Sequence, residues 1–155
     1  MKILVFGAGV LGCNLARNFF RAGKDVTLLA RGAWGESIQK NGLRIKDKFS
    51  PRMSVRRIPV TAELKAEDKY DVIFIVLRYT QLDAILDTLR TNPTKNIVFV
   101  GNDMRASALS ASLPGEKRDV CLCGLGRPSG AGVCGVRRPQ KAQGQHGLFK
   151  PTDRR

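Results

Sequence analysis

The chain has 155 residues, of which 43% are hydrophobic, so it is long enough for one domain with a buried core. No apolar run reaches the roughly 18 residues that a transmembrane helix needs, and we expect no membrane partner. The formal net charge is +14, but nine of the 27 basic and only two of the 13 acidic residues lie in 117–155. Because the charge is concentrated at one end, nucleic-acid binding is the weaker interpretation of this basic balance.

The spacing of the cysteines and the nature of the first residues indicate whether the protein binds a metal and where in the cell it is located. Cys13, Cys121, Cys123 and Cys134 have neither the spacing of a disulfide framework nor that of a zinc site, so we expect no metal. Met1 leads almost directly into an apolar segment. We therefore expect no signal peptide and a cytoplasmic location.

The first thirty residues predict a strand, a glycine turn, a helix and a second strand. Residues 1–6 and 25–30 are apolar and β-branched, and residues 13–22 carry apolar side chains at helical spacing. Between the first strand and the helix, the sequence Gly7-Ala8-Gly9-Val10-Leu11-Gly12 fits G-x-G-x-x-G, the dinucleotide-binding pattern, in the βαβ context that makes it informative.

Each glycine of this motif has a physical role. Gly7 permits a tight turn, Gly9 lets the backbone approach a pyrophosphate, and Gly12 lets the helix pack against the strand. The helix N-terminus would then face the phosphates with free N–H groups and a partial positive charge. The alternative is a glycine-rich bend with no ligand.

The residue at the end of the second strand selects the cofactor. NAD sites usually carry an acidic residue there to bind the ribose 2′-hydroxyl, whereas this chain has Arg31. A guanidinium can bind a 2′-phosphate through paired, charge-assisted hydrogen bonds. The sequence therefore predicts NADP(H), with a solvated surface arginine as the alternative.

The rest of the chain alternates between predicted strands and helices. We expect a short helix over 36–40, a hairpin from strands 43–46 and 53–58, and a central buried parallel strand over 71–77. A helix with apolar residues from 82 to 89, a strand over 96–100 and a helix over 106–113 follow. This order predicts an α/β fold of the Rossmann type, with a doubly wound, mostly parallel sheet covered by helices on both faces.

Three polar clusters follow the carboxyl ends of predicted strands: the glycine turn, residues 78–81, and Asn102 with Asp103. Ligands bind at this edge of a doubly wound sheet. We therefore expect these clusters to share one cleft.

Several stretches together resemble the ketopantoate reductase family, also called 2-dehydropantoate 2-reductases, in its amino-terminal NADP-binding domain. They are residues 2–12, 28–32, 39–43, 77–81 and 101–103, and the resemblance covers roughly residues 1–115. It implies NADPH-dependent reduction of a 2-oxo acid such as 2-dehydropantoate, on the pathway to pantothenate. It also implies cofactor contacts from the glycine motif, Arg31, Leu77, Arg78, Gln81 and Asn102.

The sequence departs from the family pattern at two of these positions. Arg78 stands where the family commonly has a lysine near the nicotinamide, and Arg and Lys are not interchangeable. Asn102 keeps the family's asparagine, but its neighbours differ. Arg78 and Asn102 are the candidate catalytic residues, and these departures put ketopantoate itself in doubt as the substrate.

The last quarter of the chain does not look like the family's helical second domain. We divide the chain into an NADP-binding domain over 1–116 and a basic Gly/Arg/Pro-rich tail over 117–155, which its composition predicts to be disordered. A frameshift near Lys117 is a further hypothesis, because reading one nucleotide later permits an apolar strand like the family's continuation. A chain truncated in this way would be catalytically weak or inactive alone and could form homo-oligomers through bared apolar surface. The alternative function is a non-catalytic NADP(H)-sensing or interaction module.

Overall fold

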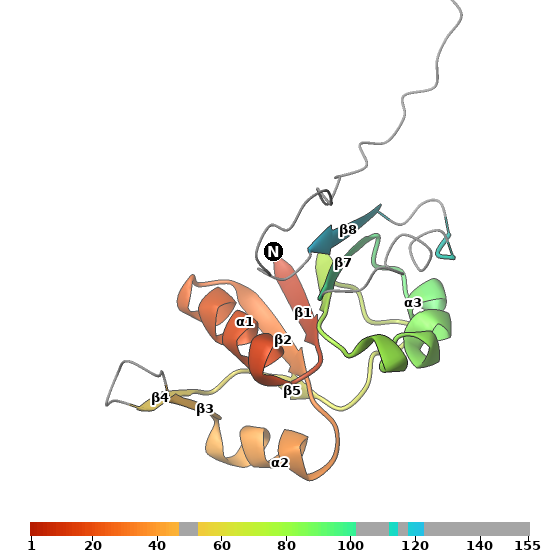
Figure 1. Cartoon of the computed structure of the whole chain (residues 1–155). Helices are drawn as coiled ribbons and strands as arrows, with labels where there is room; N and C mark the ends of the chain where they lie inside the picture. The colour runs from red at the N-terminus through yellow and green to blue at the C-terminus, as the bar shows by residue number, and fades with distance from the viewer. Residues whose placement is uncertain (47–52, 102–111, 115–117, 123–155) are drawn as a thin grey trace, which may run out of the picture.

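The computed structural model describes residues 1–46, 53–101, 112–114 and 118–122. Its centre is a six-stranded parallel sheet with the order β5-β2-β1-β6-β7-β8 (Figure 1). The strands are β1 (Lys2–Phe6), β2 (Asp25–Leu29), β5 (Val60–Thr61), β6 (Val72–Ile75), β7 (Asn96–Val100) and β8 (Arg118–Leu122). The helices are α1 (Val10–Arg21), α2 (Gly32–Asn41) and α3 (Leu86–Thr91).

Two apolar cores cover the two faces of this sheet, because successive side chains of a strand point to opposite sides. Ile3 and Val5 of β1 pack with residues of α1 and α2, whereas Leu4 and Phe6 pack with Leu89 of α3. Helices therefore lie on both faces, α1 on one and α3 on the other (Figure 1). The predicted Rossmann-type, doubly wound fold is confirmed.

The predicted central strand and hairpin are also present. β6 pairs with β1 on one side and β7 on the other, and Ile73 and Ile75 are fully buried. Its opposite face is half-buried, where the ring of Phe74 lies 5.0 Å from that of Phe19 on α1. The strands β3 (Leu43–Lys46) and β4 (Met53–Arg56) form a separate antiparallel pair.

Two elements on the edge next to β2 differ from the expectation. The helix α2 begins at Gly32 rather than at residue 36, although Gly32 and Gly35 are poor helix formers. A Cβ on Gly35 would overlap the carbonyl oxygen of Ala30, so this glycine lets the helix sit against the end of β2. The two-residue strand β5 was not predicted because it is too short to show a period; the Leu28 N–H donates to the Pro59 carbonyl at 2.9 Å.

The predicted helix after β6 is divided. Two 3-10 turns, Tyr79–Gln81 and Asp83–Ile85, precede the short helix α3. The expected apolar side chains nevertheless lie in the core: Leu82, Ile85 and Leu89 are buried, and Leu86 packs against them. Turns of this kind are common at the beginnings of α-helices.

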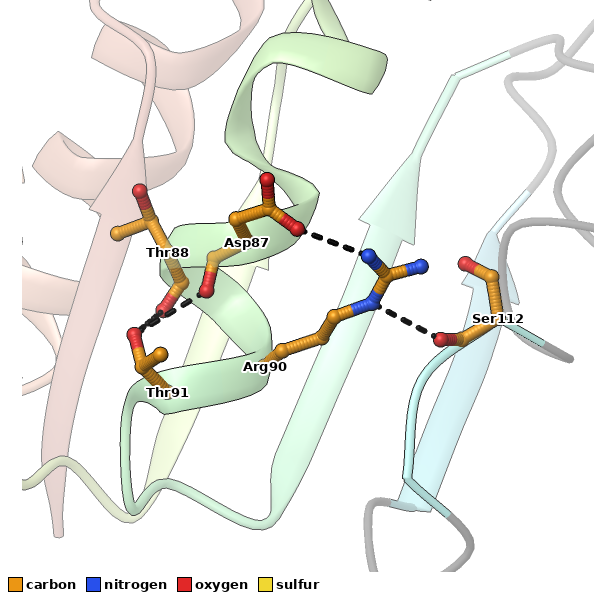
Figure 2. A network of polar contacts seen from close by, with 5 residues as sticks. All are labelled: Asp87, Thr88, Arg90, Thr91 and Ser112. Atoms are coloured by element: carbon orange, nitrogen blue, oxygen red, sulfur yellow. Dashed lines mark hydrogen bonds and ion pairs between the residues drawn. The ribbon is translucent and has the colours of Figure 1, made fainter.

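A polar network ties α3 to the segment that follows β7 (Figure 2). Arg90 donates through Nη1 to the Asp87 carboxylate at 2.8 Å and through Nε to the Ser112 carbonyl at 3.2 Å. The hydroxyl of Thr91 donates to the carbonyls of Asp87 and Thr88.

The helix expected over 106–113 lies largely outside the described residues, as do most of residues 117–155. β8 follows the boundary expected at residue 116, and it pairs with β7 in parallel over its whole length. The domain boundary and the character of the tail stay predictions.

Candidate functional site

The sheet order places a crevice at the carboxyl ends of β1 and β6. The chain leaves β1 toward β2 on one side and later returns to add β6 on the other. The connections therefore diverge at this point, which is where doubly wound sheets bind ligands. Gly7 follows β1 directly, and the Val76 N–H that follows β6 donates to the Phe6 carbonyl at 2.8 Å.

The glycine turn after β1 depends on close backbone packing. Gly7 has a φ of +117°, and a Cβ there would overlap the carbonyl oxygen of Val76. A Cβ on Gly12 would overlap the carbonyl oxygen of Gly7. By contrast, a Cβ on Gly9 would have no atom within 4 Å, so Gly9 faces open space in front of the turn.

The helix α1 begins immediately after this turn, with Gly9 as its N-cap. No side chain caps this end, and no acidic residue lies in the first turn. The first N–H groups of a helix have no partner within the helix, and its N-terminus carries a partial positive charge. This end of α1 is therefore suited to bind an anion.

A cavity of about 260 Å³ lies at the same edge of the sheet. It brings together the predicted residues of the glycine turn with those that follow β2 and β6. Its lining is Phe6, Gly7, Ala8, Gly9, Leu29, Ala30, Arg31, Trp34, Val76, Leu77, Arg78 and Gln81.

Four predicted residues are not in this lining. Val10 and Leu11 follow the turn on α1, and their side chains are 85% and 52% exposed. Gly12 is buried behind the turn and shapes it from there. Asn102 lies outside the described residues, so its predicted contact with cofactor or substrate stays a prediction.

Two arginines give the cavity its positive charge. Both are exposed and line the cavity: Arg31 lies between β2 and α2, and Arg78 follows β6. The Arg78 N–H donates to Gln81 Oε1 at 3.4 Å. Among the described lining residues these guanidinium groups are the ionisable side chains, so this region suits a ligand with several negative charges.

Trp34 is the lining residue that sequence reasoning missed. Its indole Nε1–H donates to the Ala8 carbonyl at 3.0 Å, and its side chain remains 50% exposed. The Cys13 thiol donates to the same carbonyl at 3.3 Å. Burial raises the pKa of the Cys13 thiol, which favours the protonated form that can donate this hydrogen bond.

A signal for Trp34 was present in the sequence. It stands three residues after Arg31, which is the N-cap of α2, so it lies in the first turn of the helix that begins beside this arginine. A helix starting at Gly32 rather than at residue 36 would have placed both side chains at the same end of the cavity.

Two other kinds of site were sought in the described part of the chain. No helix there is long and apolar enough to cross a membrane. Within the same residues, no three or more His, Cys, Asp or Glu side chains gather where they could hold a metal ion.

The parallel sheet, the glycine turn and the cavity at the switch point define a Rossmann-type α/β domain. The comparison with protein families goes further, because the model of the ketopantoate reductase PanE/ApbA family matches residues 3–126. The chain belongs to the ketopantoate reductase family, and the predicted resemblance is confirmed.

Individual proteins resemble the chain in sequence or in fold. The chain is 39% identical to a 2-dehydropantoate 2-reductase of Mesorhizobium japonicum over 92 residues, covering 57% of this chain and 27% of that protein. A solved PanE/ApbA family ketopantoate reductase from Ralstonia eutropha has a TM-score of 0.69 at 22% identity, over 78% of this chain and 40% of that one. D-mandelate dehydrogenase, solved with NADH and anilino(oxo)acetate, has a TM-score of 0.66 at 21% identity over the same shares.

These relatives are longer than this chain. The matches cover between 27% and 45% of the length of the curated relatives. The chain therefore spans less than half the length of the curated relatives it matches.

Proposed function

We propose that this chain is the NADP(H)-binding part of a ketopantoate-reductase-like oxidoreductase. The observation that carries the proposal is the cavity at the switch point, where the glycine turn, Arg31 and Arg78 meet. Family membership supports the same assignment.

The residues present fit a dinucleotide. Gly9 leaves open space before the N-terminus of α1, as an approaching pyrophosphate requires. Arg31 would bind the 2′-phosphate that distinguishes NADP(H) from NAD(H). Leu77, Arg78 and Gln81, which follow β6, would line the path toward the nicotinamide.

Bound NADPH would supply a hydride to the carbonyl carbon of a 2-oxo acid. The residues of this chain would bind the cofactor and substrate and supply positive charge. Arg78 would attract the substrate carboxylate or a cofactor phosphate, and Asn102 would contribute an amide to the same edge. The apolar walls Phe6, Leu29 and Val76 would limit the access of water to the cavity.

Removal of the Arg31 guanidinium tests the cofactor assignment. We expect Arg31→Ala to weaken NADPH binding by about tenfold or more, because charge-assisted hydrogen bonds to the 2′-phosphate are lost, and to leave NADH binding unchanged. Isothermal titration calorimetry of both nucleotides measures this.

Arg44→Ala is the matched control, because Arg44 is an exposed arginine on β3 that does not line the cavity. Equal weakening of NADPH and NADH by Arg31→Ala would contradict the assignment of this side chain to the 2′-phosphate. Absence of NADPH binding by the unsubstituted chain would contradict the proposed function itself.

A second candidate is a non-catalytic module that senses or reports NADP(H). It is favoured by one observation: the described residues that line the cavity include no histidine, carboxylic acid, lysine, tyrosine or cysteine, the side chains that commonly act as general acids. Capture of a protein partner that depends on NADPH, without turnover of any 2-oxo acid, would favour this module. We further propose that the protein is cytoplasmic. We also propose that it self-associates, and sedimentation of the chain at increasing concentration tests this second proposal.

A further inference from the structure

Trp34 occupies a position in the cavity that the function above does not use. Its indole reaches from the first turn of α2 to the glycine turn, where Nε1–H donates to the Ala8 carbonyl at 3.0 Å. The side chain is 50% exposed and lines the cavity together with Arg31 and Gly9.

The hydrogen bond fixes where the ring can lie. One end of the side chain is attached to a helix that begins beside Arg31, and the other is held at the glycine turn. The Ala8 carbonyl is itself held from behind by the Cys13 thiol. The indole therefore extends between the two places that would bind the 2′-phosphate and the pyrophosphate.

In NADP(H), the ribose of the adenosine lies between those two phosphate groups, since it carries one on its 2′-oxygen and the other on its 5′-oxygen. The adenine is attached to C1′, next to the carbon that bears the 2′-phosphate. A nucleotide that reaches both Arg31 and the glycine turn therefore brings its ribose and the attached adenine to the region of the indole. An exposed, immobilised aromatic ring is a stacking surface for a nucleic-acid base.

We propose that Trp34 is a specificity-determining residue that binds the adenine ring of the cofactor by stacking. This inference rests on the proposed function, because it assigns a part of the same nucleotide to a residue. It goes beyond that function in naming the side chain that selects a planar base.

Fluorescence provides a direct test, because Trp34 is the single tryptophan in the chain. The full chain is titrated with adenosine 2′,5′-bisphosphate, which carries the base and both phosphate positions but no nicotinamide. Emission should be quenched along a curve that gives the same Kd as calorimetry. Nicotinamide mononucleotide, which lacks adenine, should leave the emission unchanged.

Two substitutions separate stacking from the hydrogen bond. Trp34→Phe and Trp34→Leu both remove the Nε1–H donor, but phenylalanine keeps an aromatic face. We expect Trp34→Leu to weaken binding of adenosine 2′,5′-bisphosphate by about tenfold, and Trp34→Phe to weaken it clearly less. Phe20→Ala, at the far end of α1 and outside the cavity lining, is the control and should bind like the unsubstituted chain.

The outcomes distinguish this inference from the proposed function. Calorimetric binding of adenosine 2′,5′-bisphosphate without any change in emission would overturn the role of Trp34 and leave NADP(H) binding in place. Equal losses in the Phe and Leu variants would also overturn stacking. No binding of NADPH or of the bisphosphate would overturn both. The emission titration uses the unsubstituted chain, so it decides even if a variant does not fold.

Discussion

At the scale of single residues, the three glycines of the turn have separable roles. Gly12 is required by packing, because a Cβ there would overlap the carbonyl oxygen of Gly7. Gly9 has no neighbour that a Cβ would meet, and its backbone is extended with a φ of −74°. The fold therefore requires glycine at position 12. At position 9 the fold does not require glycine, but the close approach of a ligand to the backbone would.

This difference predicts that one alanine substitution lowers stability and that the other lowers NADPH affinity. Gly12→Ala should lower the free energy of unfolding by about 1–3 kcal/mol, as overpacking does. Gly9→Ala should stay within about 1 kcal/mol of the unsubstituted chain, yet weaken NADPH binding severely, because its methyl group occupies the space for the pyrophosphate.

Urea unfolding and calorimetry on the two variants measure both quantities. Unchanged NADPH affinity in Gly9→Ala would contradict the position assigned to the pyrophosphate. Unchanged stability in Gly12→Ala would contradict the close approach of α1 to the turn.

At the scale of elements, the connection between α3 and β7 is stabilised by a buried amide. Asn92 is 2% exposed, and its Nδ2 donates to the carbonyls of Lys65 and Asp68 at 2.9 and 2.7 Å. Its Oδ1 accepts from the Thr94 N–H at 3.0 Å. One side chain thus ties the segment before β6 to the segment before β7.

Asn92→Ala should lower the free energy of unfolding by about 2–3 kcal/mol, because the buried Thr94 N–H loses its acceptor and two part-buried hydrogen bonds to the Lys65 and Asp68 carbonyls are lost as well. Asn41→Ala is the control: Asn41 is exposed, the hydrogen bond that its Nδ2 donates to Ser37 Oγ is long at 3.4 Å, and its loss should change stability by about 0.5 kcal/mol or less. Chemical denaturation measures both, and equal effects would contradict the role of Asn92 as a clamp.

Elements with a clear period or a strong motif could be predicted from the sequence. Residues 2–6, 25–29 and 96–100 are apolar runs, and the hairpin of β3 and β4 shows alternation. The start of α2 could not be predicted from propensity, because the packing of Gly35 against Ala30 decides it. The role of Asn92 could not be predicted, since its partners Lys65 and Asp68 are distant from it in sequence.

The candidate site was predictable to a similar degree. Topology alone placed Gly7, Arg31 and Arg78 at one edge of the sheet, and the cavity brings them together. Trp34 was missed because the helix expected from residue 36 left position 34 in a loop, whereas α2 begins at Gly32 and its indole donates to the Ala8 carbonyl.

At the scale of the whole molecule, the described cavity has charge and shape for binding but no group to protonate an alkoxide. We therefore expect the chain alone to oxidise NADPH with 2-dehydropantoate at least about a hundredfold more slowly than an enzyme with a positioned general acid. Absorbance at 340 nm follows the reaction. Turnover near a typical value of about 10 s⁻¹ would contradict the expectation.

Whether residues 117–155 continue the domain or form a separate tail is also a question about the whole molecule. β8 adds Arg118–Leu122 to the sheet, and the family match reaches residue 126. The frameshift hypothesis is tested by the nucleotide sequence of the gene: an open downstream frame that encodes a helical domain would support it, and the lack of one would contradict it.

The most direct test of the central claim is an NMR titration of the isotope-labelled chain with NADPH, following backbone amide signals. The predicted result is saturable shifts in residues 7–12, 30–34 and 77–81, with the amides of the β3–β4 pair unchanged. Shifts confined to the β3–β4 pair, or no shifts at saturating NADPH, would contradict a nucleotide site at the carboxyl edge of the sheet.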